Sequence, residues 1–297
     1  MRRFISSLLT VFSLLCSVPA QASVSSALVG ILSQQNSGDG SLADVIDSAV
    51  FDLDATQAAS YTSGVTWSNL VTFPPEGSVQ TAYDFYTGDG STSTTYPAFN
   101  GSAGDAAAYW SFDGGDYFGI KSGANTAFFN ALHKTTGGTA FWFAITLHKT
   151  DNTWSTAALL ANLASAANYK GIEIGVLSTE VFSFGQGNGA GSVTNNSGIQ
   201  TSGDFIVIYS YDGSGNMRRW VNTTTATTTA ISFAASSADA AYPLRIGSWG
   251  DNSRFLNAET RIYSVAGGNE YLDDTKAAAI INALCARHNR NYTGSCL

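Results

Sequence analysis

Residues 141–149 read FWFAITLHK, and this run is the clearest guide to the fold. Every second residue in it is large and apolar, namely Phe141, Phe143, Ile145 and Leu147. Because successive side chains of a strand point to opposite faces, these four share one face of an extended chain. The run therefore predicts a β-strand.

Two further stretches predict hairpins, each built around a turn rich in Asp and Gly. Residues 205–211 and 217–222 flank the turn DGSGN at 212–216. Residues 109–112 and 117–120 flank the turn DGGD at 113–116. Turn-forming residues between two apolar runs are typical of antiparallel strand pairs.

Shorter runs predict more strands at 157–163, 171–177, 181–184, 244–247 and 260–265. A dozen or so short strands at close spacing, mostly antiparallel, favour two packed sheets. The fold class that we expect is therefore all-β, a jelly-roll sandwich of two antiparallel sheets.

One helix is predicted at the C-terminal end. Asp273 can cap it, and Arg287 and Arg290 suit the negative end of its dipole. Its apolar positions recur at helical spacing, at Ala277, Ile280, Ile281, Leu284 and His288. This stripe predicts that the helix packs on the sandwich.

The N-terminus has the pattern of a bacterial-type signal peptide. Arg2 and Arg3 precede a short apolar run at 4–16, and Ala20-Gln21-Ala22 matches a cleavage site. We expect residues 1–22 to be removed, 23–49 to form an N-terminal arm and 50–297 to form the sandwich domain. The mature protein is then secreted, periplasmic or on the cell surface, with no further membrane-inserting stretch.

The composition narrows the classes of partner. Charged residues make up 12% of the chain, and the formal net charge is −8. So acidic a protein repels phosphate backbones and anionic lipid, which argues against nucleic-acid binding. The negative charge could instead say nothing about partners and only keep an exported protein soluble.

Cys285 and Cys296 are the two cysteines outside the predicted signal peptide. In an oxidising compartment such a pair is expected to form a disulfide. The bridge would hold the C-terminal tail, and two thiols alone are too few for a zinc site.

The order of these segments resembles the laminin-G-like, pentraxin-like branch of the concanavalin A-like lectin/glucanase superfamily. The resemblance lies in residues 109–118, 141–145, 205–222 and 244–263, and upstream in residues 53–55 and 66–70. It departs from the family pattern at 257–259, where NAE replaces the usual Asn-Gly. The resemblance implies a sandwich that often binds glycans or proteins and sometimes holds calcium, but a fold does not fix a function.

The carboxylate pattern of the superfamily's glycosidases is not found. Such enzymes need two acids about 5 Å apart, projected from one strand. After Glu173, the matching positions hold Gly175 and Ser178, and we expect Glu173 and Glu180 to be solvated. His148 is the best placed histidine for a lyase, but no partner motif accompanies it. We therefore predict no catalytic residues and no enzyme activity.

Polar loops supply the candidate ligand-binding residues. A tryptophan in such a loop can stack on a sugar ring beside Asp or Asn side chains, so Trp249 with Asp251 and Asn252 is the first choice and Trp154 the second. Each tryptophan could instead fold back over the sandwich edge. Calcium is possible at Asp251, Asp113 and Asp116, although turn chemistry alone also favours Asp there.

Two functions from different classes follow. The first is a non-catalytic, lectin-like domain that binds glycan or a cell-surface ligand through loops at the sandwich edge. The second is a structural subunit of an extracellular fibre, surface layer or adhesive appendage, which would self-assemble. A third and weaker option is an unrecognised hydrolase or lyase.

Overall fold

The structure is a computed structural model that describes residues 40–134, 139–151, 155–164, 170–188, 192–231 and 237–294. The predicted signal peptide, most of the predicted arm, Trp154 and Cys296 lie outside the described residues. In the described part, no helix has the length and apolar character needed to cross a membrane.

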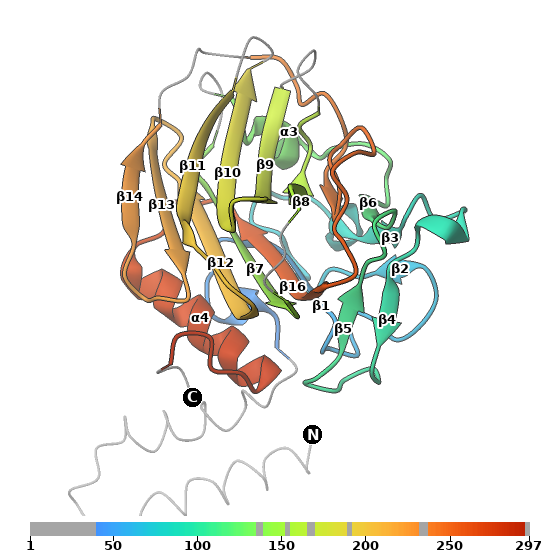
Figure 1. Ribbon diagram of the computed structural model, residues 1–297. Coiled ribbons are helices and arrows are strands. Elements are labelled where there is room, and N and C mark those ends of the chain that lie inside the picture. The colour runs from blue at the N-terminus through green and yellow to red at the C-terminus, as the bar shows by residue number, and fades with distance from the viewer. Residues whose placement is uncertain are drawn as a thin grey trace, which may run out of the picture. The chain divides into compact units, whose positions relative to one another are not determined.

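The described chain folds into two antiparallel β-sheets, which form two layers in Figure 1. Sheet A has the order β14 (Thr227–Ala230), β13 (Asn216–Val221), β12 (Gly203–Tyr211), β7 (Phe141–Lys149), β16 (Thr260–Gly268), β5 (Tyr109–Ser111) and β4 (Ala98–Asn100), and β1 (Ala49–Asp54) also pairs with β16. Sheet B has the order β11 (Ser192–Ile199), β10 (Val181–Asn188), β9 (Lys170–Leu177), β8 (Ala157–Ala161), β15 (Arg245–Ile246), β6 (Phe118–Ile120), β3 (Phe85–Thr87) and β2 (Thr66–Trp67). The predicted all-β sandwich of two antiparallel sheets is confirmed.

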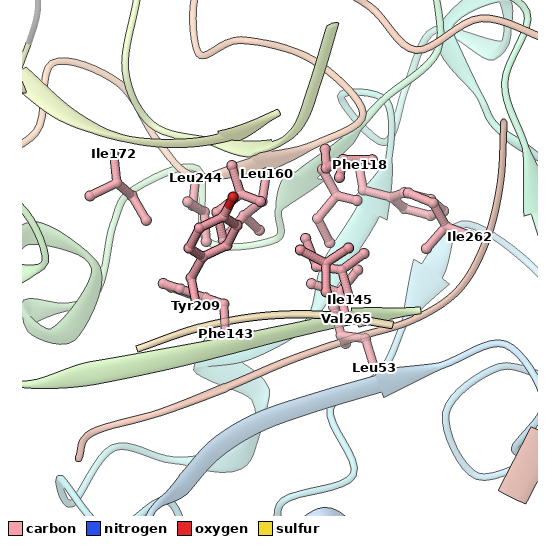
Figure 2. Packing of buried hydrophobic residues seen from close by; sticks show 14 of the residues in the cluster. Leu53, Phe118, Phe143, Ile145, Leu160, Ile172, Tyr209, Leu244, Ile262 and Val265 are labelled. Atoms are coloured by element: carbon pink, nitrogen blue, oxygen red, sulfur yellow. The ribbon is translucent and has the colours of Figure 1, made fainter. Parts of the chain in front are cut away.

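The main core lies between the sheets. Figure 2 shows Phe143, Ile145 and Tyr209 of sheet A pointing toward Leu160 and Ile172 of sheet B. The alternation of residues 141–149 correctly predicted a strand with one apolar face, because its four large apolar side chains are all in this cluster. Each buried side chain of this size contributes roughly 1.5–3 kcal/mol to folding.

The first predicted hairpin is confirmed and the second is wrong. Strands β12 and β13 pair antiparallel, with Tyr211 opposite Met217. Strands β5 and β6 also follow one another closely, but β5 pairs in sheet A and β6 in sheet B. The turn at 113–116 therefore carries the chain from one sheet to the other. As a result, Trp110 and Phe118 face the core from opposite layers.

A second apolar cluster lies on the outer face of sheet A, under helix α4 (Asp274–His288). Asp273 caps this helix by accepting a hydrogen bond from the backbone N–H of Lys276 at 2.8 Å. The predicted stripe is buried against Trp142, Ile206 and Ile208 of the sheet. In Figure 1 the helix lies along one side of sheet A.

The remaining helical elements are short. They are α3 (Ala127–Ala131) and the 3-10 turns η1 (Leu42–Asp44), η2 (Gln80–Tyr83) and η3 (Ser93–Thr95). The η1 turn contacts the sandwich, since Leu42 is fully buried and its N–H donates to the Asp52 carboxylate at 2.8 Å. Residues from Gly40 onward belong to one compact unit with the strands.

Candidate functional site

One row of residues crosses the outer face of sheet B. Gly119 of β6 lies directly opposite Arg245 of β15 on one side and Tyr86 of β3 on the other. Residues opposite one another in a ladder share a face. The next residues along these strands, Ile246 and Phe118, lie in the core, so the row itself faces outward.

Tyr117, Gly119 and Lys121 also alternate along β6 and its flanks, so all three lie on this outer face. Together with Tyr86, Arg245 and Asp89 they line a hollow of about 230 Å³, which we call the tyrosine hollow. This is smaller than the pockets of about 300–1,000 Å³ that hold drug-sized ligands. Its volume suits one ring of a small molecule or one unit of a longer chain.

Glycine makes the hollow possible. A Cβ atom on Gly119 would lie 3.0 Å from the carbonyl oxygen of Gly88 and 3.7 Å from the Tyr117 ring, inside the hollow. Gly88 has φ +57°, and a Cβ there would lie 2.1 Å from the Thr95 hydroxyl. Both positions therefore need glycine, and the floor between the two tyrosines stays open.

Each wall of the tyrosine hollow pairs a cation with a ring. The Cζ atom of Arg245 lies 4.6 Å from the centroid of the Tyr117 ring. The Nζ atom of Lys121 lies 5.6 Å from the centroid of the Tyr86 ring. Cations within about 6 Å of an aromatic face are attracted to it, so these contacts hold both side chains beside the hollow.

The hydroxyl groups of Tyr86 and Tyr117 have no hydrogen-bond partner within the described part of the chain. Tyr86 is half-buried and Tyr117 is buried to 6% exposure. A tyrosine offers an apolar ring and a polar end together. The hollow thus presents two ring surfaces and two groups that can both donate and accept hydrogen bonds.

The carboxylates near the hollow are already engaged. Asp89 accepts hydrogen bonds from the backbone N–H groups of Ser91 and Thr92 at 2.8 and 2.7 Å, and these bonds lower its pKa to about 2. Asp84 accepts from the N–H of Asn69 at 2.9 Å and lies 3.6 Å from the Lys121 ammonium. The charges that remain available at the hollow are therefore positive.

Trp249, the first predicted sugar-stacking residue, is not exposed. It packs on Ala158 and Ala161 on the outer face of β8 and retains only 5% of its accessible surface. The guanidinium of Arg254 covers its ring, with Cζ 3.7 Å from the centroid. The indole thus folds back over the sheet, the alternative that the sequence left open, because two alanines leave room that it fills.

Asp251 and Asn252 lie in the turn that follows Trp249. Asp251 accepts a hydrogen bond from the Ser253 hydroxyl at 2.5 Å, and Asn252 has φ +60°. The carbonyl oxygen of the Asn252 side chain accepts a hydrogen bond from Arg245. Asn252 therefore supports the cation of the tyrosine hollow, and its predicted role as a direct ligand stays a prediction.

Asp113 and Asp116 organise the turn between the two sheets. Oδ1 of Asp113 accepts from the N–H of Gly115 and Oδ2 of Asp116 accepts from the N–H of Asp113, both at 3.0 Å. Burial raises the pKa of Asp116 to about 6. Within the described ranges, no three His, Cys, Asp or Glu residues gather as metal ligands do. Calcium at Asp251, Asp113 or Asp116 stays a prediction.

Glu173 is not solvated as expected. It lies on the outer face of β9 with 8% exposure, and burial raises its pKa. The Arg254 guanidinium, 3.8 Å away, and the indole N–H of Trp249 lower that pKa in part, although the indole nitrogen does not reach hydrogen-bond geometry. Trp249 thus covers this acid as well as the alanines of β8.

The three histidines have structural partners. His148 Nδ1 lies 2.8 Å from the Asp204 carboxylate, and His133 Nε2 donates to the carbonyl oxygen of Ala238 at 3.0 Å. Burial lowers the pKa of His133 to about 4. His288 is the last residue of α4 and is buried, with its Nε2 atom 3.0 Å from Oδ2 of Asp54.

Trp154 and Cys296 lie outside the described residues, so the second predicted sugar ligand and the Cys285–Cys296 bridge remain predictions. Cys285 itself is fully buried on α4.

Tyr86, Tyr117, Lys121 and Arg245 are not among the site residues that the sequence predicts. One signal was present, since Tyr117, Gly119 and Lys121 alternate with apolar residues and so share a face. The approach of Tyr86 and Arg245 depends on which strands pair across the sheet. That pairing joins residues far apart in the chain, and local patterns do not specify it.

No family model matches the chain, and no curated protein matches it. Solved structures do match in fold. The binding domain of botulinum neurotoxin serotype D/C superposes with a TM-score of 0.50 at 12% identity, covering 81% of this chain and 53% of that one. A sialidase from Trypanosoma rangeli, solved in complex with sialic acid, superposes with a TM-score of 0.53 at 12% identity, covering 80% of this chain and 33% of that one.

The chain therefore spans about half of the toxin domain and a third of the sialidase. At such low identity these likenesses concern the fold alone. They agree with the architecture of this chain, an all-β sandwich of the jelly-roll kind.

Proposed function

We propose that this protein is an exported, non-catalytic domain that binds a saccharide in the tyrosine hollow. The observation that carries the proposal is the juxtaposition of Tyr86 and Tyr117 on either side of a glycine floor. Sugar sites combine ring surfaces for C–H faces with polar groups for hydroxyls. Here both tyrosines supply a ring together with an unengaged hydroxyl.

The position of the hollow fits this role. It lies where β3, β6 and β15 meet the loops at Gly88, Gly123 and Pro243, so a chain of sugars can extend beyond it into solvent. Two structures of similar fold are compatible with the proposal. The sialidase was solved in complex with a sugar, sialic acid. The toxin domain is named a binding domain.

The proposal also keeps the laminin-G-like, concanavalin A-like assignment. The likeness in residues 141–145 and 205–222 maps onto the adjacent strands β7, β12 and β13 of sheet A. The likeness in residues 109–118 maps onto the crossing between sheets. These placements support the assignment, which a family alignment seeded with this chain would test.

A glycan array tests the proposed function. The protein without residues 1–22 should bind a defined subset of saccharides, and Tyr86→Ala should weaken that binding about tenfold, since an aromatic contact is lost with the area it covers. Tyr96→Ala, a half-buried tyrosine outside the hollow, is the matched control and should bind as the parent does. Absence of binding on the whole array, or binding that Tyr86→Ala leaves unchanged, contradicts the proposal.

The non-catalytic part of the proposal rests on the positions of the candidate acids. Glu173 lies under Trp249 and Arg254, and Glu180 lies in a turn with φ +62°. Neither lines the tyrosine hollow. Incubation with a polysaccharide panel should release no reducing or unsaturated ends, and their release would contradict this part.

The alternative function, a structural subunit, is favoured by one observation. Strand β14 ends sheet A, and all four of its residues are exposed. An open edge strand can pair with a strand of another chain. Light scattering after size exclusion separates the two functions: a monomer at all concentrations opposes assembly, whereas growing oligomers that Thr228→Pro abolishes would support it.

A further inference from the structure

Arg245 is the charged residue on the outer face of sheet B that bears most on the ligand of the tyrosine hollow. It lines the tyrosine hollow, it is half-buried, and it forms no ion pair within the described ranges of the chain. Its contacts are the Tyr117 ring and the neutral side-chain oxygen of Asn252. A half-buried guanidinium that lines a hollow without an acid of the protein beside it is available to pair with an anionic group of a ligand.

The other arginines of similar environment do not share this position. Arg218 is also half-buried over a ring, with its Cζ atom 4.9 Å from the centroid of Tyr271, but it lies on β13 of sheet A and not at the hollow. Arg254, Arg287 and Arg290 form ion pairs with acids of the protein. Arg261 lies over the Tyr109 ring at 4.7 Å, but on sheet A and away from the hollow.

Lys121 adds a second positive charge on the opposite wall. Its pair with Asp84 is long, at 3.6 Å, and 36% of its side chain remains exposed. Asp89, the carboxylate on the rim, is turned to the N–H groups of its own loop. Burial lowers the pKa of Arg245, and Asp251, which accepts the Ser253 hydroxyl, offsets this only in part.

We infer that the saccharide bound in the tyrosine hollow is anionic, and that its carboxylate or sulfate group pairs with Arg245. This inference rests on the proposed function and names its ligand class. The planar guanidinium presents two parallel N–H donors, which match the paired oxygens of either anion. The sugar ring then lies against Tyr86 and Tyr117, and Lys121 completes the positive side of the hollow.

A phosphate backbone does not fit the same surface. The protein carries a net charge of −8, and a long polyanion would meet that charge beyond the hollow. A single acidic group on a sugar meets only the two cations of the hollow. We therefore expect the hollow to select saccharides that carry one acidic group beside one sugar ring.

The test compares acidic sugars with their neutral counterparts. The array carries oligogalacturonate, its methyl ester, a sulfated oligogalactan and the unsulfated oligogalactan, together with mammalian and bacterial acidic glycans and their neutral forms. We expect the bound set to consist of acidic members, with at least about tenfold preference over each neutral counterpart. The carboxylate and sulfate arms show which anion is preferred.

Arg245→Gln should weaken binding of the best acidic saccharide about tenfold or more, because a charge-assisted pair is lost. Binding of the neutral counterpart should weaken much less than binding of the acidic saccharide, because the neutral sugar has no anion to lose its pair. Arg261→Gln is the matched control, since it removes a guanidinium from a tyrosine ring elsewhere. Thermal unfolding of each variant verifies that it is folded.

The outcomes separate the two proposals. If no saccharide binds, the proposed function fails. If neutral and acidic counterparts bind equally, or if Arg245→Gln binds the acidic saccharide as the parent does while Tyr86→Ala does not, the inference fails and the proposed function stands.

Discussion

Nη1 of Arg287 donates to Oδ2 of Asp54 at 2.9 Å and thereby joins the last helix to the first strand, 233 residues apart. The same nitrogen lies 3.1 Å from Oδ2 of Asp52, and Nε2 of His288 lies 3.0 Å from Oδ2 of Asp54. Nη2 of Arg287 donates to the carbonyl oxygen of Gly40 at 2.6 Å. These contacts lie in the buried interface between α4 and sheet A.

Arg287→Met should therefore destabilise the protein strongly. It leaves the buried carboxylate of Asp52 without its cation and that of Asp54 with His288 alone, a change that costs roughly 3–5 kcal/mol. Denaturant unfolding measures the loss. Lys276→Met removes an exposed pair with Glu270 and should cost at most about 1 kcal/mol. Equal and small losses in the two variants would contradict a structural role for the Arg287 cluster.

Asp116 should make stability depend on pH. Because burial raises its pKa from 3.8 to about 6 in the folded state, the folded protein binds more protons than the unfolded chain between these values. The contribution of Asp116 is fully present below the lower value and is lost as pH rises through the higher one. Asp116→Asn keeps an oxygen for the N–H of Asp113 and should flatten this dependence.

Denaturation midpoints measured from about pH 4 to about pH 7 test the effect of Asp116. Asp105→Asn, which changes an acid at an exposed turn, should follow the parent curve. A slope that Asp116→Asn leaves unaltered would oppose the assignment.

Trp249 should support the fold and not the ligand. Trp249→Ala removes a buried indole from Ala158 and Ala161 and leaves Glu173 open to water, at a cost of about 3–5 kcal/mol. Trp249→Phe should retain most of the stability and bind saccharide as the parent does. If Trp249→Phe is as stable as the parent but no longer binds, Trp249 has its predicted stacking role and the saccharide does not bind in the tyrosine hollow.

Removal of calcium should leave saccharide binding unchanged. The groups that carry the proposed site are the rings of Tyr86 and Tyr117 and the guanidinium of Arg245, none of which is a calcium ligand. Affinity measured in EDTA should equal affinity in about millimolar calcium. A loss in EDTA that Asp251→Ala reproduces would instead support the predicted calcium site.

The sequence was sufficient to predict the elements that rest on local periodicity. Three elements carry their signal within a few neighbouring residues. They are the strand at 141–149, the hairpin around 212–216 and the helix capped by Asp273. The partition of β5 and β6 between two sheets was not predicted, because a turn of Asp and Gly serves a crossing as well as a hairpin. Which of the two forms depends on how the strands pair with the rest of each sheet.

The candidate site was harder to predict for the same reason. Trp249 stands among polar residues, and its burial depends on the small size of Ala158 and Ala161, which no local pattern links to it. Likewise the acids of β1 alternate with apolar residues as on a solvated strand. They are buried because Arg287 and His288 reach them from the far end of the chain.

The central claim is that Tyr86, Tyr117 and Arg245 form a saccharide site, and NMR tests it most directly. The ¹⁵N-labelled protein is titrated with the best saccharide from the array, and the shifts of backbone amides and of the arginine Nε–H groups are followed. Binding in the tyrosine hollow predicts saturable shifts at Gly88, Gly119 and the Arg245 Nε–H, with no change at β14. Shifts confined to the turn at 251–252 or to β14, with Gly119 and Arg245 unmoved, would contradict it.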